Sequence, residues 1–390
     1  EISACLVGSE MCIRDRSKQD QLFLQMIREF AEKEVKPLAA EVDESERFPM
    51  ETVQKMAKLG IMGIPFPVEY GGAGGNNILY TMAVEELSRV CATTGVIVSA
   101  HTSLCCAPIM EHGTPEQKAK YLPKLTSGEW IGAFGLTEPN AGTDASAQQT
   151  FAVKEGDHYV LNGSKIFITN AGYAHVYIIM AMTDKSKGTK GISAFIVEKD
   201  FPGFSIGKKE KKMGIRGSAT CELIMENCIV PAENLLGQEG KGFGIAMKTL
   251  DGGRIGIASQ ALGIAQGAMD ETVKYVKERK QFGKSLGQFQ NTQFQLADLQ
   301  TKVEASRLLV RQAAYKKDQK VPYSADAAMA KLFAAETAME VTTKAVQFHG
   351  GYGYTREYPV ERMMRDAKIT EIYEGTSEVQ RMVIAANLLK

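Results

Sequence analysis

The 390-residue chain has no excess of either charge, because 46 lysines and arginines balance 46 aspartates and glutamates. This balance excludes the broad basic surface of most nucleic-acid-binding proteins, so no nucleic-acid partner is expected. No run approaches the roughly 18 consecutive apolar residues of a bilayer-spanning helix, so membrane insertion is not expected either. The 37 glycines follow no period, which excludes a collagen-like or low-complexity chain.

Paired cysteine and histidine motifs are also absent. The seven cysteines form no C-x-x-C pair, and the five histidines form no H-x-x-x-H pair, so no metal site is predicted. An odd number of irregularly spaced cysteines in a chain of this size indicates reduced thiols inside a cell.

The common nucleotide and hydrolase motifs fail as well. No G-x-G-x-x-G follows a strand, and the P-loop ending at Gly283-Lys284-Ser285 lacks its first glycine, because residue 278 is glutamate. A Rossmann domain and a P-loop are therefore not supported. The segment Gly203–Gly207 matches G-x-S-x-G, but the charged run Lys208–Lys212 follows it instead of a helix. A short strand beside a charged turn is the favoured interpretation.

Residues 1–16 fit nothing that follows them. They hold two of the seven cysteines and match neither a secretory signal nor a transit peptide. We interpret them as a non-native leader, and the alternative is a disordered native extension.

Residues 17–128 are predicted to form a helical domain. From Ser17 onward, apolar residues such as Phe23, Ile27 and Phe30 recur at helical spacing. The segment Thr114-Pro115-Glu116-Gln117 has the composition of a helix start, with a cap residue, proline in the first turn and glutamine at the third position.

The periodicity changes after Gly128. Short apolar runs bounded by turn residues, such as Val176–Met182 and Gly191–Val197, predict an antiparallel β-domain over 129–236. Helical periodicity then returns over about 242–278, 290–317, 323–347 and 376–389, which predicts a four-helix bundle over 237–390. The fold class is therefore α+β and multidomain, with an N-terminal α-helical domain, a central antiparallel β-domain and a C-terminal four-helix bundle.

Five separated motifs carry a family resemblance. They are Phe134–Asp144 (FGLTEPNAGTD), Lys165–Asn170 (KIFITN), Glu278–Gly283 (ERKQFG), Gln347–Gly351 (QFHGG) and Glu371–Glu378 (EIYEGTSE). In order and spacing the chain closely resembles the acyl-CoA dehydrogenase family from Ser17 to Lys390, and within it the short-chain, butyryl-CoA branch. The resemblance implies non-covalent FAD without a Rossmann motif, a homotetramer, and reoxidation by electron-transferring flavoprotein.

The resemblance also implies which residues bind FAD. They are Phe134, Leu136, Thr137, Gly142, Thr143, Phe167, Ile168, Thr169, Arg279, Gln290, Gln347, Gly350, Gly351, Thr376, Ser377 and Glu378. Thr169 is the candidate for the hydrogen bond to flavin N5. Arg279, Gln290 and the segment 347–351 match positions that reach the ADP part, largely across a subunit boundary. Without the family match, a turn is the favoured interpretation of 134–143 and a solvated helix end that of Arg279. A plain strand at 167–169 and a helix cap at 376–378 are the alternatives for the other segments.

Glu374 matches the catalytic base of the family. A carboxylate that faces an apolar acyl pocket should have a raised pKa and be a stronger base. Some relatives carry the base in the long helix after the β-domain, where this chain has Gly253, which cannot serve. Thr143, Asp251, Arg254 and Gly375 match substrate-binding positions. The alternative interpretations are a first-turn acid for Glu374 and a helix interruption at the two glycines, Gly252 and Gly253.

The expected function is FAD-dependent α,β-dehydrogenation of short-chain acyl-CoA, from butyryl-CoA to crotonyl-CoA or in reverse. Two alternatives stay open: an acyl-CoA dehydrogenase for medium or branched short chains, and a non-catalytic acyl-CoA-binding protein on the same fold. The expected location is a bacterial cytoplasm, with a mitochondrial matrix as the less favoured alternative.

Overall fold

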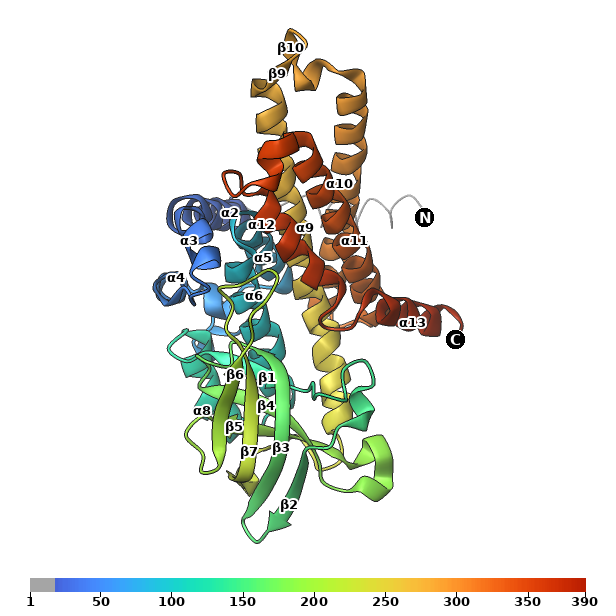
Figure 1. Ribbon diagram of the computed structural model, residues 1–390. Coiled ribbons are helices and arrows are strands. Elements are labelled where there is room, and N and C mark those ends of the chain that lie inside the picture. Colours follow the sequence, from blue (N-terminus) through green and yellow to red (C-terminus); the bar gives the residue numbers. More distant parts are fainter. Residues whose placement is uncertain (1–17) are drawn as a thin grey trace.

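The computed structural model describes residues 18–390. The expected leader, residues 1–16, and Ser17 lie outside this range. Within it, helices come first, strands follow and long helices end the chain, as Figure 1 shows along its colour bar. The predicted fold class is confirmed.

The N-terminal part is helical, and its helices pack around two apolar clusters. They are α2 (Lys18–Phe30), α3 (Ala39–Glu44), α4 (Met50–Lys58), α5 (Asn77–Val90), α6 (Ala92–Ser99), α7 (Ala107–His112) and α8 (Pro115–Thr126). The predicted start of α8 is confirmed, because Thr114 and Gln117 each accept a hydrogen bond from the other's backbone N–H, at 3.2 and 3.0 Å. This reciprocal pair satisfies two N–H groups that a helix start otherwise leaves free.

One helical segment, Ala92–His112, is long and apolar enough to cross a membrane by length and composition. The sequence criterion missed it because it counted consecutive apolar residues, and polar residues such as Thr94 and Ser99 interrupt this segment. In the structure, 89% of its most apolar window is buried inside the protein. The central helix of a folded core has the same composition, so burial accounts for its apolar character.

The strands of the central domain form one sheet. They are β1 (Gly132–Gly135), β2 (Phe151–Glu155), β3 (His158–Thr169), β4 (Val176–Met182), β5 (Ile192–Glu198), β6 (Phe204–Lys209), β7 (Thr220–Pro231) and β8 (Leu235–Leu236). The order β6–β7–β3–β2–β4–β5–β8 is mainly antiparallel, whereas β1 and one residue of β2 pair with β4 in parallel. Those parallel contacts were not predicted. The element after β6 is strand β7 rather than a helix, so the G-x-S-x-G segment lacks the structural setting of a hydrolase nucleophile.

The C-terminal part consists of long packed helices. They are α9 (Gly242–Glu278), α10 (Gln290–Asp318), α11 (Ser324–His349), α12 (Val360–Lys368) and α13 (Ser377–Leu388). The four predicted helical segments agree with α9, α10, α11 and α13 to within two residues, and α12 was not predicted. Helix α9 continues through Gly252 and Gly253, so the alternative of a helix interruption there is wrong. A short hairpin, β9 (Lys280–Gln281) and β10 (Lys284–Ser285), projects between α9 and α10 (Figure 1).

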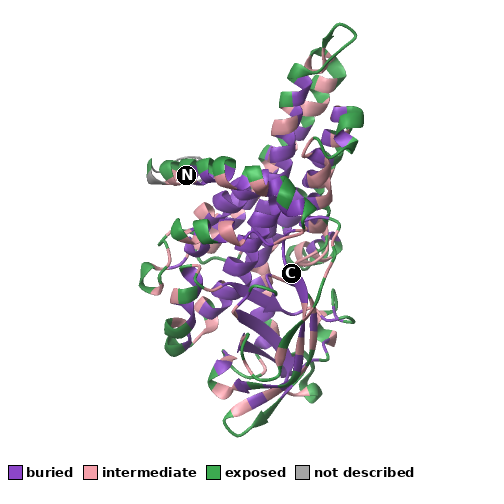
Figure 2. Cartoon of the chain, turned by 60° about the vertical axis from the view of Figure 1, so that its left-hand side comes forward, coloured by how far each residue is buried: buried purple, intermediate pink, exposed green. Residues whose placement is uncertain are grey.

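The connections between these parts are short. Helix α8 ends at Thr126 and β1 begins at Gly132, while β8 ends at Leu236 and α9 begins at Gly242. We retain boundaries after residues 128 and 236 as our proposal for the domain division. The parts nevertheless share apolar cores, because α6 residues pack in the same cluster as α9, α10 and α11. Figure 2 shows the buried residues running through these central helices and into the sheet.

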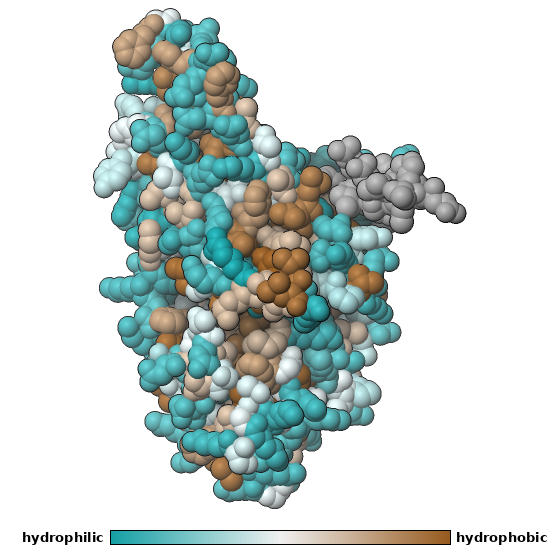
Figure 3. Space-filling model, turned by 90° about the vertical axis from the view of Figure 1, so that its right-hand side faces the viewer, coloured by the Kyte–Doolittle hydropathy of each residue, from teal (hydrophilic) through white to brown (hydrophobic). Residues whose placement is uncertain are grey.

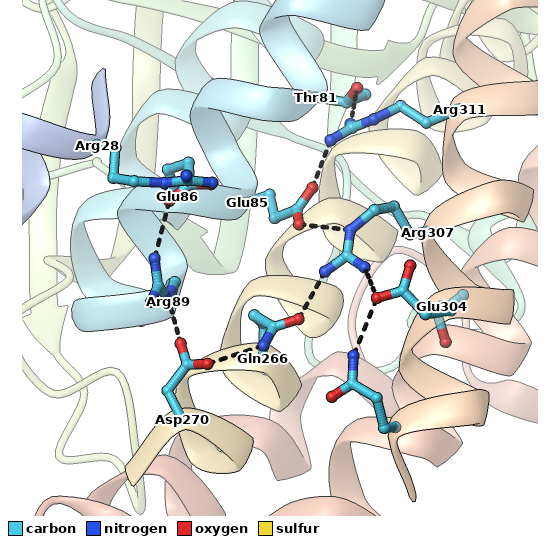
Figure 4. A network of polar contacts seen from close by, with 12 residues as sticks. Arg28, Thr81, Glu85, Glu86, Arg89, Gln266, Asp270, Glu304, Arg307 and Arg311 are labelled. Carbon is cyan, nitrogen blue, oxygen red and sulfur yellow. Dashed lines mark hydrogen bonds and ion pairs between the residues drawn. The ribbon is translucent and has the colours of Figure 1, made fainter. Parts of the chain in front are cut away.

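A network of charged side chains joins α5 to α9 and α10 (Figure 4). The carboxylate of Glu85 on α5 accepts hydrogen bonds from Arg307, at 2.9 Å, and from Arg311, both on α10. Arg307 also donates to Gln266 of α9 at 2.7 Å. The side chains of Glu85 and Arg311 are only 7% and 6% exposed. One buried carboxylate therefore serves two guanidinium groups at the junction of three helices.

We expect Glu85→Gln to lower the free energy of unfolding by about 3 kcal/mol, because a buried ion pair that loses one partner leaves an uncompensated charge. Glu41→Gln is the matched control, since Glu41 pairs with Arg47 at the surface and is 52% exposed. It should leave stability almost unchanged, because water screens a surface ion pair. Denaturant unfolding of both variants measures the difference, and equal losses would contradict the structural role of the network.

Candidate active site

Two adjoining cavities, of about 280 and 590 Å³, lie where the sheet meets the long helices. Their shared walls are Thr137, Gly142, Thr143, Phe167, Thr169, Tyr373, Glu374 and Gly375. The smaller cavity continues between apolar side chains of the helices, including Leu104 and Leu250. The larger one continues toward Ile215 and Ile372. The two spaces form one site with Glu374 at their junction.

Most of the predicted site residues lie on these walls, although they come from four separate segments of the chain. They are Phe134, Leu136, Thr137, Gly142, Thr143, Phe167, Ile168, Thr169, Arg254, Glu374, Gly375 and Thr376. Asp251 lies one turn before Arg254 and contacts its side chain. The fold therefore brings the predicted strand, helix and loop positions to one place.

Besides Asp251, seven predicted residues do not line the cavities: Arg279, Gln290, Gln347, Gly350, Gly351, Ser377 and Glu378. Arg279 and Gln290 are exposed and flank the β9–β10 hairpin, at the far end of the bundle from the sheet (Figure 1). The guanidinium of Arg279 lies 5.8 Å from the ring centre of Tyr352, next to the exposed Gly350–Gly351 turn. Within one chain, residues 279 and 350–351 thus form a separate exposed group.

Ser377 and Glu378 begin α13. The hydroxyl oxygen of Ser377 is buried and has no hydrogen-bond partner among the described residues, whereas Glu378 is exposed. Thr376 acts as the N-cap, since its hydroxyl accepts a hydrogen bond from the N–H of Val379 at 3.5 Å. The capping interpretation of Thr376 therefore holds beside its place on the cavity wall.

The loop after β1 is held by a buried lysine that the sequence interpretation did not single out. Lys165 on β3 is fully buried, and its ammonium group donates to Glu138 Oε1 at 2.7 Å, to Gln148 Oε1 at 3.1 Å and to the carbonyl of Leu136 at 3.2 Å. The N–H of Ile166 donates to the carbonyl of Thr137 at 2.9 Å. These bonds engage the carbonyls of Leu136 and Thr137 from behind the cavity wall.

Glu138 completes this support. Its carboxylate also accepts hydrogen bonds from the N–H groups of Gln149 and Thr150, at 2.5 and 3.0 Å. Burial opposes its ionisation, but the charge of Lys165 and the two N–H donors outweigh burial and lower the pKa of Glu138. The loop is therefore closed at both ends by one charged pair.

Phe167 is an exposed aromatic residue at a break in the strand pairing. The register between β3 and β7 shifts between Lys165 and Ile168, and Phe167 has a φ of +59°. Its side chain is 60% exposed on the cavity wall, whereas Ile168 is buried. A bulge that turns an apolar ring out of the sheet is costly unless a partner covers that ring.

Glu374 lies in a tight turn between the preceding helical segment and α13. It has a φ of +55°, and the following Gly375 has a φ of +91°. One carboxyl oxygen, Oε2, is buried and has no hydrogen-bond partner among the described residues. Burial raises the pKa of Glu374 to about 8, while the positive charges of Lys331 and Arg254 oppose the rise. The predicted raised pKa has this cause, and it suits a proton acceptor near neutral pH.

Gly253 is the reason that this carboxylate fits against α9. A Cβ atom at position 253 would lie 2.0 Å from Glu374 Oε2 and 2.8 Å from Leu104 Cδ2. Both distances are shorter than any ordinary non-bonded contact, so no other residue fits there without displacing Glu374. Position 253, where some relatives carry the base, therefore has no side chain here, and the carboxylate of Glu374 occupies the space beside it.

Arg254 and Asp251 form an ion pair beside this contact. Arg254 is 5% exposed, and its guanidinium donates to Asp251 Oδ1 at 2.5 Å. Ser324 of α11 donates to the same oxygen at 2.9 Å. Burial raises the pKa of Asp251, and Arg254 opposes that rise. The Nε of Arg254 is buried with no partner among the described residues, so one donor remains free at the cavity.

Comparison with known proteins identifies the family of this fold and site. Three family models match this chain. The model of the acyl-CoA dehydrogenase N-terminal domain matches residues 17–129, that of the middle domain matches 133–228, and that of the C-terminal domain matches 240–389. A short-chain specific acyl-CoA dehydrogenase of Clostridium acetobutylicum is 67% identical over 96% of this chain and 99% of its own. This chain belongs to the acyl-CoA dehydrogenase family.

Solved structures agree with this assignment. Butyryl-CoA dehydrogenase of Megasphaera elsdenii is 54% identical, with a TM-score of 0.95 over 96% of this chain and 99% of that chain. A chain from a structural study of the electron transferring flavoprotein of Acidaminococcus fermentans, concerned with flavin-based electron bifurcation, is 57% identical. Its TM-score is 0.96 over 97% of this chain and 99% of that chain. The resemblance stated from the sequence motifs is confirmed.

The acyl-CoA dehydrogenase family is flavin-dependent, and the described residues fit such a group. The exposed ring of Phe167 offers an apolar face, and a flavin ring could cover it. Open space surrounds Gly142, where an added Cβ would meet nothing within 4 Å, so a ligand can approach the backbone closely. The unpartnered Ser377 hydroxyl supplies a buried polar group near the start of α13.

The raised pKa of Glu374 predicts a pH-dependent stability. A carboxyl group with a pKa of about 8 in the folded protein and an ordinary value near 4.5 when unfolded destabilises the fold as pH rises through this window. Glu374→Gln should therefore match the wild type near pH 4 and be more stable by roughly 3 kcal/mol at pH 7. Unfolding measured across this pH range tests the difference.

Glu378→Gln is the matched control for that measurement. The pKa of Glu378 is lowered, first by its own backbone N–H at the start of α13 and then by the hydroxyl of Thr376. Its removal should therefore cost stability at neutral pH and have no effect at low pH, which is the opposite sign. A stability difference for Glu374→Gln that stays constant from pH 4 to 8 would show that its carboxyl group is not buried as described.

Proposed function

We propose that this protein is an FAD-dependent dehydrogenase of short-chain acyl-CoA, which converts butyryl-CoA to crotonyl-CoA or runs in reverse. The observation that carries the proposal is the buried carboxylate of Glu374, with a free oxygen, at the junction of two cavities. A buried, unpaired carboxylate is costly to keep and is typical of a group that accepts a proton from a bound substrate. The names of the relatives support the short-chain class.

Glu374 removes the α-proton of the acyl thioester in this proposal. Its pKa of about 8 makes the carboxylate a stronger base than an exposed glutamate. When bound, FAD supplies the hydride acceptor for the β-hydrogen at its N5 atom. Glu374 cannot be replaced by a second base on α9, because that position is Gly253. Apolar side chains line much of the cavity, and burial leaves the carboxyl group of Glu374 poorly solvated.

The residues that would hold FAD are the predicted ones on the cavity walls. Leu136 and Thr137 would offer backbone and hydroxyl groups, Phe167 and Ile168 would lie beside the ring, and Thr169 would donate to N5. Two hydrogen bonds support this role, because Lys165 donates to the carbonyl of Leu136 and the N–H of Ile166 donates to the carbonyl of Thr137. They fix the loop that would carry the proposed donors. Pre-arranged donors of this kind lose little entropy on binding.

Thr143, Asp251, Arg254 and Gly375 would contact the substrate. Arg254 supplies a buried cation with one unpartnered donor, and Asp251 fixes its orientation. Thr143 and the open Gly142 stand at the wall shared by both cavities. This arrangement supports an entry for the CoA part over the loop and an acyl end toward Leu104.

Arg279, Gln290, Gln347, Gly350 and Gly351 would reach the ADP part of FAD from a neighbouring subunit of a homotetramer. Their distance from the cavities within one chain supports this arrangement. Apolar side chains also gather near the middle of the face that carries α13 (Figure 3). On α13, Met382 and Leu388 are 67% and 80% exposed. Exposed apolar surface of this kind is typical of subunit contacts.

The electron acceptor would be an electron-transferring flavoprotein. The similarity to a chain from the study of such a flavoprotein in Acidaminococcus fermentans supports this partner. Bacterial relatives support a cytoplasmic location.

Glu374→Gln tests the central assignment. Gln keeps the size of the side chain but cannot accept a proton, so bleaching of the bound flavin by butyryl-CoA should fall by at least about 10³-fold. The flavin content should not change, because the proposed flavin contacts are other residues. Stopped-flow absorbance of the purified holoenzyme measures the rate. A rate close to that of the wild type would place the base elsewhere, and a wild type that butyryl-CoA never bleaches would favour the non-catalytic alternative.

The chain-length optimum should be four carbons, and Leu104 should help to set it. Leu104 lies beside Glu374 on the wall of the smaller cavity. Leu104→Ala removes three carbons, so the preference for hexanoyl-CoA over butyryl-CoA, measured as kcat/KM, should rise by roughly tenfold. Leu122→Ala is the control, because this buried leucine belongs to the same apolar cluster but does not line the cavity. An optimum at eight carbons or on a branched chain in the wild type would contradict the short-chain assignment.

A further inference from the structure

Lys331 is a buried lysine directly behind the Glu374 turn. It lies on the buried face of α11, beside the fully buried Ala327, Ala328, Ala330, Ala334 and Ala335, and is itself 0% exposed. Its ammonium group donates a hydrogen bond to the backbone carbonyl of Gly375 at 2.7 Å. Burying a charged amine costs free energy unless nearby groups compensate it. The groups that Lys331 contacts should therefore explain why a lysine is buried here.

What Lys331 touches is a turn of unusual backbone geometry. Glu374 and Gly375 both have positive φ values, and a non-glycine residue in this region is held there by its surroundings. Two buried side chains hold this turn through the same carbonyl. Lys331 donates to Gly375 O from α11, and Gln380 donates to it from α13 at 2.8 Å and to Glu374 O at 3.3 Å.

Only one of these two side chains also brings a charge. Gln380 is neutral, whereas Lys331 places an ammonium group one residue from the carboxylate. The other ionisable groups around this pair are Arg254 on α9, Glu371 before the turn, Glu378 on α13, and the hydroxyls of Tyr80 and Tyr373. Arg254 is already paired with Asp251. Among the described residues, the ammonium group of Lys331 donates to a backbone carbonyl and to no carboxylate. Its positive charge therefore acts on the nearby Glu374 without a hydrogen-bonded acidic partner of its own.

We propose that Lys331 is a positioning residue for Glu374, which fixes the turn through Gly375 and places a compensating positive charge behind the carboxylate. The inference rests on the proposed role of Glu374 as the base.

Two effects on Glu374 follow from this placement. Burial raises the pKa of Glu374 and Lys331 opposes the rise, while burial lowers the pKa of Lys331 and Glu374 opposes that fall. Removing the lysine charge should therefore raise the pKa of Glu374 further. The deprotonated base would then form only at higher pH, and less of it would be present at neutral pH.

Three variants separate the hydrogen bond from the charge. Lys331→Gln keeps a donor but loses the charge, Lys331→Arg keeps the charge, and Gln380→Met removes a neutral donor to the same carbonyl. In each, the rate of flavin bleaching by butyryl-CoA is measured against pH. A second readout needs no turnover: the infrared carbonyl band of the protonated Glu374 carboxyl, identified by its absence in Glu374→Gln, is titrated without substrate.

We expect the rising limb of the pH profile and the infrared transition to move up together in Lys331→Gln, by at least about one pH unit. Both should stay in place in Lys331→Arg and in Gln380→Met, although Gln380→Met should be slower at every pH. Thermal unfolding of each holoenzyme accompanies these measurements. If Lys331→Gln does not fold, Lys331→Arg still tests the proposal, because a shifted infrared transition in this variant, which keeps the charge, would overturn it.

An unshifted limb and an unshifted infrared transition in Lys331→Gln would overturn the proposal for Lys331. The same shift in Gln380→Met would also overturn it, because loosening of the turn rather than charge would then be the cause. Neither result would contradict the proposed function. That function would be contradicted by a Glu374→Gln enzyme that is still active. The two ideas therefore fail on different variants.

Discussion

The close contact between Glu374 and helix α9 is the constraint on which the site depends. It exists because residue 253 has no side chain, so the carboxylate occupies the space that a Cβ would need. The contact removes one carboxyl oxygen from water and gives it no donor, and this burial raises the pKa of Glu374. A glycine in a helix interior is normally a weak point, at about 1 kcal/mol relative to alanine. Here the small size of Gly253 lets the turn at Glu374 and Gly375 pack directly against α9.

Two buried lysines in this protein hold backbone carbonyls. Lys165 binds the carbonyl of Leu136 as well as Glu138, and Lys331 binds the carbonyl of Gly375. In each case a long side chain from a regular element reaches a loop that has little secondary structure of its own. Such a bond is strong because one partner is charged and water is excluded. The two loops that line the cavity are thereby fixed from outside it.

The proposed cofactor site is divided between nearby and remote residues. One chain brings together the segments at 134–143, 167–169 and 374–376, because β1, β3 and the turn before α13 meet at the end of the sheet. It leaves Arg279 and the 350–351 turn in a separate group. In our proposal both sets bind one ligand, and a second copy of the chain would supply the remote set. The exposed apolar side chains of α13 support that proposal.

Much of this protein could be predicted from sequence because its signals are local. Helix α8 carries its capping box within four residues, and the four longest predicted helical segments repeat apolar residues over many turns. Five short motifs were enough for the family, and they singled out Glu374, which lies at the junction of the two cavities. Local patterns could not reveal the parallel pairing of β1 with β4, since that depends on strands more than forty residues apart. Nor could they show that Lys165 and Lys331 are buried, because lysine is normally a surface residue and only the packing of other elements takes these two out of water. The sequence alone determined which groups can do chemistry, through residue type and motif. Tertiary structure decided how basic Glu374 is and where it lies. Helices α9, α11 and α13 set its pKa and hold its turn, and these helices meet only in the folded chain.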